Sequence, residues 1–198
     1  MGILNTGLEL YNQSLDLIEN KESIRIFEFG DQIGMEEVPF SGKPAKMYFE
    51  EKNYEYVSLD FNGRHGALKR DITSDLSDLG YFDIVTNFGS SEHVEPLHNQ
   101  YLCFRSLHNL CKCGGIIINQ VPPIGKWLGH SPAHYDLSFF EILAKYNEYN
   151  LKILHIDESD LISCIFQKNI EKGFMLLEEF PFDKIFWDEN NPNKGDYT

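Results

Sequence analysis

Polar and small residues stand at the ends of several apparent β-strands, and their types suit ligand binding. Glu28 and Gly30 close a first strand, Asp60 closes a second, and Asp71 follows in the segment LKRDITSDL. The run 87–89, Asn-Phe-Gly, closes a further strand. In open parallel sheets, ligands bind beyond the carboxyl ends of the strands, where carboxylates accept hydrogen bonds and glycine lets the backbone approach closely. We therefore expect one ligand site at these strand ends.

Histidines that could accept a proton follow two of the strands. His93 lies just beyond the Asn-Phe-Gly run, and His130 and His134 lie in a later loop. Because histidine exchanges protons near neutral pH, these rings are candidates for a general base. Trp127 and Tyr135 of the same loop could shape a substrate pocket. The alternatives are structural: a helix-start residue bonded to backbone for His93, and solvated loop histidines for the other two.

Hydrophobic periodicity predicts the elements that must position these residues. Short β-branched and aromatic runs predict six buried strands, at 24–30, 54–60, 82–89, 115–121, 151–157 and 161–167. Apolar residues spaced by three and four predict helices within 4–18, 94–113 and 136–150. The second helix is expected to stop at Gly114 and Gly115, and Asp136 is the N-cap candidate of the third. Strands that alternate with helices indicate an α/β fold with a parallel sheet covered on both faces.

One stretch departs from this regular alternation. Residues 32–49 contain Pro39, Gly42 and Pro44 and show no clean period. The helix that usually follows the first strand is therefore predicted to be short, irregular or displaced.

Five segments in order, IFEFGDQ, VSLDFNG, RDITSDL, FDIVTNFGSSEHV and CGGIIINQV, resemble the motif series of class I S-adenosylmethionine-dependent methyltransferases. The resemblance covers about residues 20–167, and order and spacing carry it rather than any single motif. It implies a doubly wound, mostly parallel seven-stranded sheet with helices on both faces. Its last, antiparallel strand would come from 161–167 or from 173–180.

The resemblance also implies roles for individual residues. Glu28 and Gly30 would lie at the amino-acid end of S-adenosylmethionine, and Asp60 would bind the ribose hydroxyls. The other implied cofactor residues are Asp71 at the adenine amine, Ile72 beside it, and Asn87, Phe88 and Gly89 beneath the reactive methyl group. His93 or His134 would be the base for O- or N-methylation of a polar metabolite or sugar-like precursor. Trp127, His130 and Tyr135 would contact this small-molecule substrate.

The turn after the first strand is altered, because FGDQIGM has Gly30 and Gly34 but no closely spaced third glycine. This favours the alternative of a non-catalytic binding or scaffold protein that keeps the methyltransferase fold. A nicotinamide-dependent enzyme is disfavoured further, because no G-x-G-x-x-G follows any strand.

Composition limits the partners. A formal net charge of −14 repels nucleic acid and acidic membrane surfaces. No apolar stretch is long enough to span a bilayer and the first residues do not resemble a signal peptide, so a cytoplasmic location is expected. The Cys111 and Cys113 pair has the wrong spacing for a zinc site, and no metal is expected. The expected organisation is one domain, 1–198, with an N-terminal helix in 1–22 and a polar tail at 188–198; the oligomeric state stays open.

Overall fold

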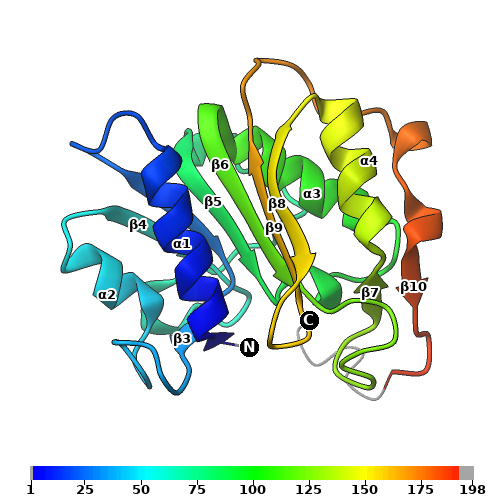
Figure 1. Ribbon diagram of the computed structural model, residues 1–198, viewed down its shortest axis with the longest axis horizontal. Helices are drawn as coiled ribbons and strands as arrows, with labels where there is room; N and C mark the ends of the chain where they lie inside the picture. Colours follow the sequence, from blue (N-terminus) through cyan, green and yellow to red (C-terminus); the bar gives the residue numbers. More distant parts are fainter. Residues whose placement is uncertain (1, 192–198) are drawn as a thin grey trace.

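The computed structural model describes residues 2–191, and a six-stranded sheet forms its centre (Figure 1). The strands lie in the order β4-β2-β5-β6-β9-β8. Their bounds are β2 Arg25–Phe29, β4 Glu55–Leu59, β5 Phe82–Phe88, β6 Cys111–Val121, β8 Asn150–Ile156 and β9 Ile162–Gln167. Strands β4, β2, β5 and β6 pair in parallel, whereas β9 runs antiparallel to both β6 and β8. All six predicted strands are confirmed, and the antiparallel member comes from 161–167 rather than 173–180.

The prediction of seven strands is wrong for the described residues, because no strand lies beyond β4 in this sheet. The segment after β4 forms 3₁₀ turns instead, η1 at Arg64–Gly66 and η2 at Ser77–Leu79. The carboxylates of Asp71 and Asp75 accept hydrogen bonds from the backbone N–H groups two residues on, at 2.8 and 2.9 Å. Such local bonds compete with a strand ladder, which explains the lost edge strand.

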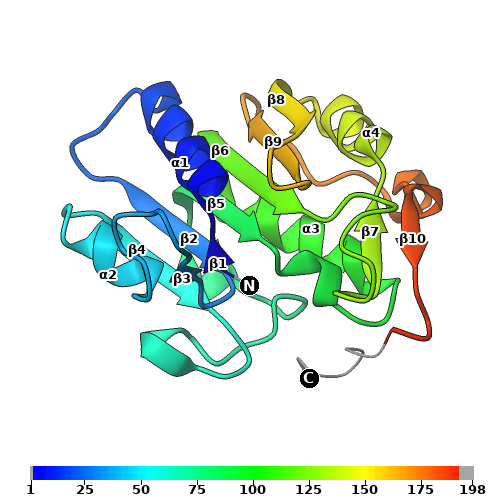
Figure 2. The same cartoon turned by 60° about the horizontal axis from the view of Figure 1, so that its bottom comes forward.

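Helices cover both faces of the sheet, as predicted (Figure 2). Helices α1 (Asn5–Leu17) and α2 (Ala45–Glu50) pack on one face, and α3 (Asn99–Leu110) and α4 (Leu137–Asn147) pack on the other. Alternate residues of β2 explain the two cores, since Ile26 joins the first and Phe27 the second, and both are fully buried. Helix α2 has 6 residues and follows a long irregular segment, so the expectation for 32–49 is confirmed.

The predicted helix ends are partly right. Asp136 is the N-cap of α4, because its side chain accepts a hydrogen bond from the Ser138 backbone N–H at 2.8 Å. Helix α3 ends at Leu110, four residues before the predicted stop at Gly114. Cys111 already pairs with Phe82, so β6 begins before the glycines. The register then shifts, because Ile84 pairs with Ile116, and the extra residues of β6, which include both glycines, bulge out between these two pairs.

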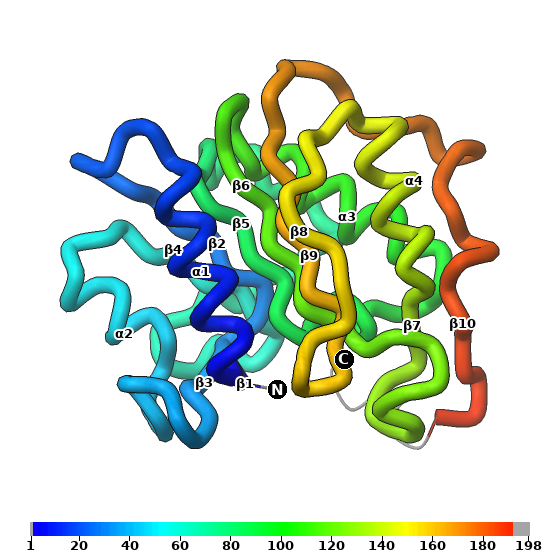
Figure 3. The backbone as a smooth tube through the Cα atoms, viewed as in Figure 1, coloured from blue at the N-terminus to red at the C-terminus, as the bar shows by residue number. Residues whose placement is uncertain are grey.

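Two short sheets lie outside the central one. Strand β1 (Gly2–Ile3) pairs with β3 (Ile33–Gly34), and β7 (Ala133–Tyr135) pairs with β10 (Ile185–Trp187). The remaining 3₁₀ turns are η3 Ser91–His93, η4 Leu177–Glu179 and η5 Phe182–Lys184. Figure 3 shows the loop between β6 and β7 folding back at the lower edge of the view.

Among the described residues, no helix is long and apolar enough to cross a membrane. Most of the predicted polar tail, residues 192–198, lies outside the described part.

Candidate functional site

A cavity of about 410 Å³ opens where β2, β4 and β5 end. Gly30, Asp60 and Gly89, which directly follow these three strands, all line it, together with His93. Four residues that the sequence singled out, far apart along the chain, therefore share one wall. Parallel strands place their carboxyl ends at one edge of the sheet, and this is the reason for their convergence.

Asp60 presents a carboxylate to this cavity. One of its oxygens accepts a hydrogen bond from the Asn62 backbone N–H at 2.8 Å, which forms a local turn. The side chain is only half-buried, and the turn uses one of two oxygens. The carboxylate therefore keeps acceptor capacity for the hydroxyl groups of a ligand.

Gln32 occupies the place where a closely spaced glycine is missing from the turn after β2. Its amide nitrogen donates to the Ser90 hydroxyl at 3.1 Å, and its Oε1 is buried without a hydrogen-bond partner among the described residues. Gly30 has φ +106°, and a Cβ there would collide with the Gln32 and Ser90 side chains. The missing glycine is visible in the sequence, but Gln32 was not among the predicted site residues, although it lines the cavity.

Glu28 does not line the cavity. It is fully buried under α1 and α2, where it accepts hydrogen bonds from the Tyr56 hydroxyl at 2.7 Å and the Gln32 backbone N–H at 3.3 Å. Burial raises the pKa of Glu28 to about 8, and the hydrogen bond from Tyr56 opposes this effect. In this structure Glu28 supports the turn that carries Gln32.

Three further predicted cofactor residues also lie outside the wall of the cavity. Asp71 is half-buried in its turn with Thr73, and Ile72 is fully buried in the core under α3. Phe88 packs on Tyr11, with ring centroids 5.2 Å apart. The sequence pattern identified these positions, but their side chains serve turns and core in the described geometry.

Asn87 anchors the turn η3 that follows β5. Its amide donates to the Ser91 hydroxyl at 2.9 Å, and its carbonyl accepts from the Ser91 backbone N–H at 2.9 Å. Ser91 in turn contacts the Tyr135 hydroxyl at 2.9 Å, and this hydroxyl donates to the Gln100 side chain at 2.7 Å. All four side chains are buried, and this network fixes the direction of the next two residues, Glu92 and His93.

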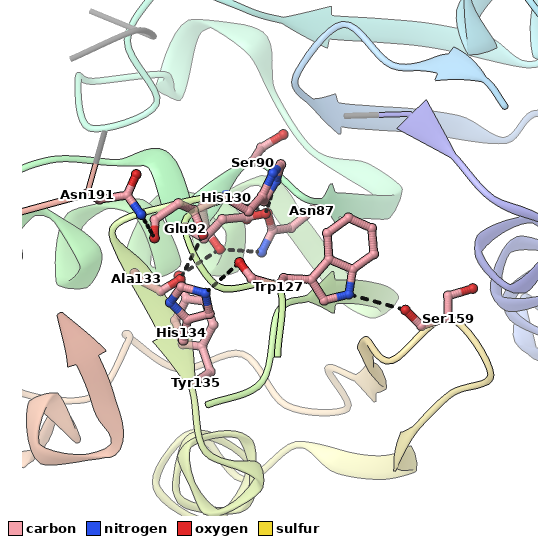
Figure 4. Close-up of polar contacts among 12 residues, drawn as sticks. Asn87, Ser90, Glu92, Trp127, His130, Ala133, His134, Tyr135, Ser159 and Asn191 are labelled. Atoms are coloured by element: carbon pink, nitrogen blue, oxygen red, sulfur yellow. Dashed lines mark hydrogen bonds and ion pairs between the residues drawn. The ribbon is translucent and has the colours of Figure 1, made fainter. Parts of the chain in front are cut away.

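Glu92, His93 and His130 form a cluster beside the cavity. Their donor atoms all lie within 4.8 Å of one another, and Glu92 is 0% exposed. One Glu92 oxygen lies 4.0 Å from Nε2 of His130, and Figure 4 shows these two side chains next to each other. Burial raises the pKa of Glu92 to about 8 and lowers the pKa of His93 to about 3. Both histidines were among the predicted site residues, whereas Glu92 was not, although it directly precedes His93.

The loop between β6 and β7 brings His130 to this cluster. Its turn is held at the Trp127 carbonyl, which accepts from the His130 backbone N–H at 3.0 Å and from Nε2 of His134 at 3.2 Å. The Trp127 indole N–H donates to the Ser159 carbonyl at 3.2 Å, which ties the loop to the β8–β9 connection. His134 and Tyr135 are almost completely buried, whereas Trp127 is exposed.

Comparison with known proteins identifies the fold through solved structures rather than through sequence. No protein-family model matches the sequence, and no curated protein matches it. The chain is similar in structure to the N-methyltransferase NodS from Bradyrhizobium japonicum, which was solved in complex with S-adenosylhomocysteine. The two sequences are 12% identical and the TM-score is 0.58. The match covers 83% of this chain and 88% of NodS.

Two further solved structures agree. The 1,6-didemethyltoxoflavin-N1-methyltransferase from Burkholderia thailandensis, with bound 1,6-didemethyltoxoflavin and S-adenosylhomocysteine, gives 10% identity and a TM-score of 0.57 over 82% of this chain and 77% of that one. A SAM-dependent methyltransferase from Archaeoglobus fulgidus gives 14% identity and a TM-score of 0.54 over 82% and 92%. The chain therefore has the class I S-adenosylmethionine-dependent methyltransferase fold.

Proposed function

We propose that this protein binds S-adenosylmethionine and methylates an oxygen or nitrogen atom of a small polar molecule. The observation that carries the proposal is the cavity beyond β2, β4 and β5, where Gly30, Asp60 and Gly89 converge in a methyltransferase fold. NodS and the 1,6-didemethyltoxoflavin-N1-methyltransferase, which share this fold, both hold S-adenosylhomocysteine in their solved structures.

The residues of the cavity fit the parts of such a cofactor. Asp60 would accept hydrogen bonds from the ribose hydroxyls, and Gly30 and Gly89 would let backbone pass close to the ligand. The buried Oε1 of Gln32 needs a donor, and the ammonium group of the methionine part would supply one. Glu28 and Asn87 would act indirectly, by holding the turns that carry Gln32 and His93.

The other cofactor assignments are part of the same proposal. Asp71 and Ile72 would approach the adenine, and Phe88 would support the site from beneath. One Asp71 carboxylate oxygen already accepts the Thr73 backbone N–H, so the other oxygen would have to accept the hydrogen bond from the adenine.

The cofactor would supply an electrophilic methyl group, and the protein would orient the acceptor and remove its proton. His93 lines the cavity and is one candidate base. His134 is the other: its Nε2 donates to the Trp127 carbonyl, so Nδ1 carries the lone pair. Trp127 and His130 would contact the acceptor, and Tyr135 would shape this region through its bond to Ser91.

A second candidate is a binding or scaffold protein without catalysis. The position of Gln32 favours it, because a side chain fills space beside Gly30 where the family pattern has a glycine.

Isothermal titration of the purified protein with S-adenosylmethionine and S-adenosylhomocysteine, with NAD as control, separates the two. Saturable binding of the first two ligands only is expected. Absence of binding by folded protein would reject the enzyme and leave the scaffold.

A further inference from the structure

A fully buried carboxylate without a matching donor is the most unusual feature beside the cavity. Neither oxygen of Glu92 accepts a hydrogen bond from another residue of the described chain. Nε2 of His130 lies 4.0 Å from one Glu92 oxygen, and this distance is longer than a hydrogen bond. Burying a carboxylate that accepts no hydrogen bond from the described residues costs folding free energy, and a cation bound at its oxygens would offset this cost.

Two imidazole rings face the same space. The centroids of His93 and His130 lie 5.1 Å apart, and their planes are inclined by 76°, so the rings do not stack. With Glu92 they offer three donor atoms within 4.8 Å of one another. A tetrahedral zinc ion with ligand bonds of about 2.0–2.1 Å holds its donors about 3.3–3.5 Å apart. Donor atoms as much as 4.8 Å apart would need to approach one another by up to about 1.5 Å, which side-chain rotation about χ angles can supply.

Rigid supports hold the three residues from two directions. The network of Asn87, Ser91, Tyr135 and Gln100 fixes the turn that carries Glu92 and His93. The Trp127 carbonyl holds the turn that carries His130. Metal sites require such outer supports, because they keep ligand atoms in place before the ion arrives.

We propose that Glu92, His93 and His130 bind one first-row divalent cation, for which Zn²⁺ is the natural probe. Two imidazoles with one carboxylate favour zinc or a neighbouring transition metal over Mg²⁺ or Ca²⁺, which prefer oxygen ligands. Three protein ligands leave a fourth position open, as in catalytic rather than structural zinc sites. The expectation that no metal binds was based on the pair Cys111 and Cys113. This pair lies at the first residues of β6, whereas the loop that carries His130 follows the last.

Metal binding goes beyond the proposed function and does not depend on it. If the protein also methylates an acceptor, the ion would bind the acceptor hydroxyl and lower its pKa, because a Lewis acid stabilises the anion. His93 would then be a ligand, and His134 would remain the candidate base.

The test uses the full chain, stripped of metal with EDTA and dialysed, in the absence of S-adenosylmethionine. Zn²⁺ is titrated in competition with a chromophoric chelator, and Co²⁺ is added separately to record its visible absorption. One Zn²⁺ per chain is expected, with the intense Co²⁺ bands of a four-coordinate site. Glu92→Gln, His93→Gln and His130→Gln should each weaken Zn²⁺ binding at least about 100-fold, since even supporting residues of metal sites cost 10–100-fold.

The matched control is His155→Gln, which removes an exposed histidine of β8 and should bind Zn²⁺ like the wild type. Circular dichroism checks that each variant is folded. No saturable binding by folded wild-type protein would overturn the inference, and so would equal affinities in the three variants and the control. Saturable Zn²⁺ binding by a chain that fails to bind S-adenosylmethionine would support the inference and reject the proposed function.

Discussion

Replacing Asp60 with asparagine removes a charge from the cavity and little else. The Asp60 carboxylate accepts the Asn62 backbone N–H at 2.8 Å through one oxygen, and an asparagine carbonyl can accept the same bond. The local turn is therefore kept, and the substitution isolates what the second carboxylate oxygen does for a ligand. Asp60→Ala would remove the turn bond as well, so it is the less specific variant.

The expected loss follows from the hydrogen bonds to the ribose. Hydrogen bonds to a charged group contribute about 1.5–3 kcal/mol, which corresponds to about 10-fold to 150-fold in affinity. Because Asp60 is half-buried, solvent screens part of this effect, and we expect the lower half of that range. Isothermal titration with S-adenosylhomocysteine at constant salt measures the change.

Asp75→Asn is the matched control, because Asp75 makes the same kind of turn with the Ser77 backbone N–H at 2.9 Å and lies outside this cavity. It should bind like the wild type. Equal affinity of Asp60→Asn and Asp75→Asn would refute the assignment of Asp60 to the ribose.

Three further perturbations test the turn after β2, a buried acid and a helix cap. Gln32→Gly should weaken S-adenosylmethionine binding about 10-fold by removing the acceptor for the ammonium group; tighter binding in the same titration would mean that Gln32 blocks the site. Glu28 has a folded pKa of about 8, above its unfolded value of 4.5, so its contribution to stability is complete below pH 4.5 and is lost as the pH rises to 8. Glu28→Gln should reduce the difference between the urea midpoints of unfolding at pH 5 and pH 8. Glu92, whose pKa is also raised, contributes to this difference in the same direction, so part of it should remain. An unchanged difference would contradict the raised pKa of Glu28. Asp136→Ala should cost about 1 kcal/mol by uncapping α4, seen as a lower Tm, and an unchanged Tm would argue against the cap.

The fold was largely predictable, because the spacing of hydrophobic residues along the chain indicates which segments form strands and which form helices. The six strands and the cap at Asp136 follow from local pattern, and local pattern is visible in one sequence. The seventh strand was wrong because it came from resemblance, whereas the turns of Asp71 and Asp75 with their own backbone exclude it here. An Asp followed two residues later by a hydroxyl residue was the available signal.

The site was predictable only in part, since side-chain direction depends on tertiary contacts. Gly30, Asp60 and Gly89 converge because strand ends meet, which topology alone requires. The direction of Glu28 depends on the buried Tyr56 hydroxyl, which no local pattern shows. Glu92 is similar, because the His130 ring 4.0 Å from its carboxylate belongs to a loop that comes only after β6 in the chain.

Ser91 joins the two proposed sites. It accepts from Asn87 and contacts the Tyr135 hydroxyl, so it ties the end of β5 to the strand after the His130 loop. Ser91→Ala leaves the Tyr135 hydroxyl with one partner fewer and loosens η3, which carries both Glu92 and His93.

We expect Ser91→Ala to weaken both S-adenosylmethionine and Zn²⁺ binding, each at least about threefold, because a lost buried hydrogen bond costs about 1 kcal/mol or more. Asp60→Asn should weaken only the cofactor, and Glu92→Gln only the metal. Titration of all three variants with both ligands measures this. If Ser91→Ala alters one affinity alone, the turn does not couple the sites, and each is held by its own loop.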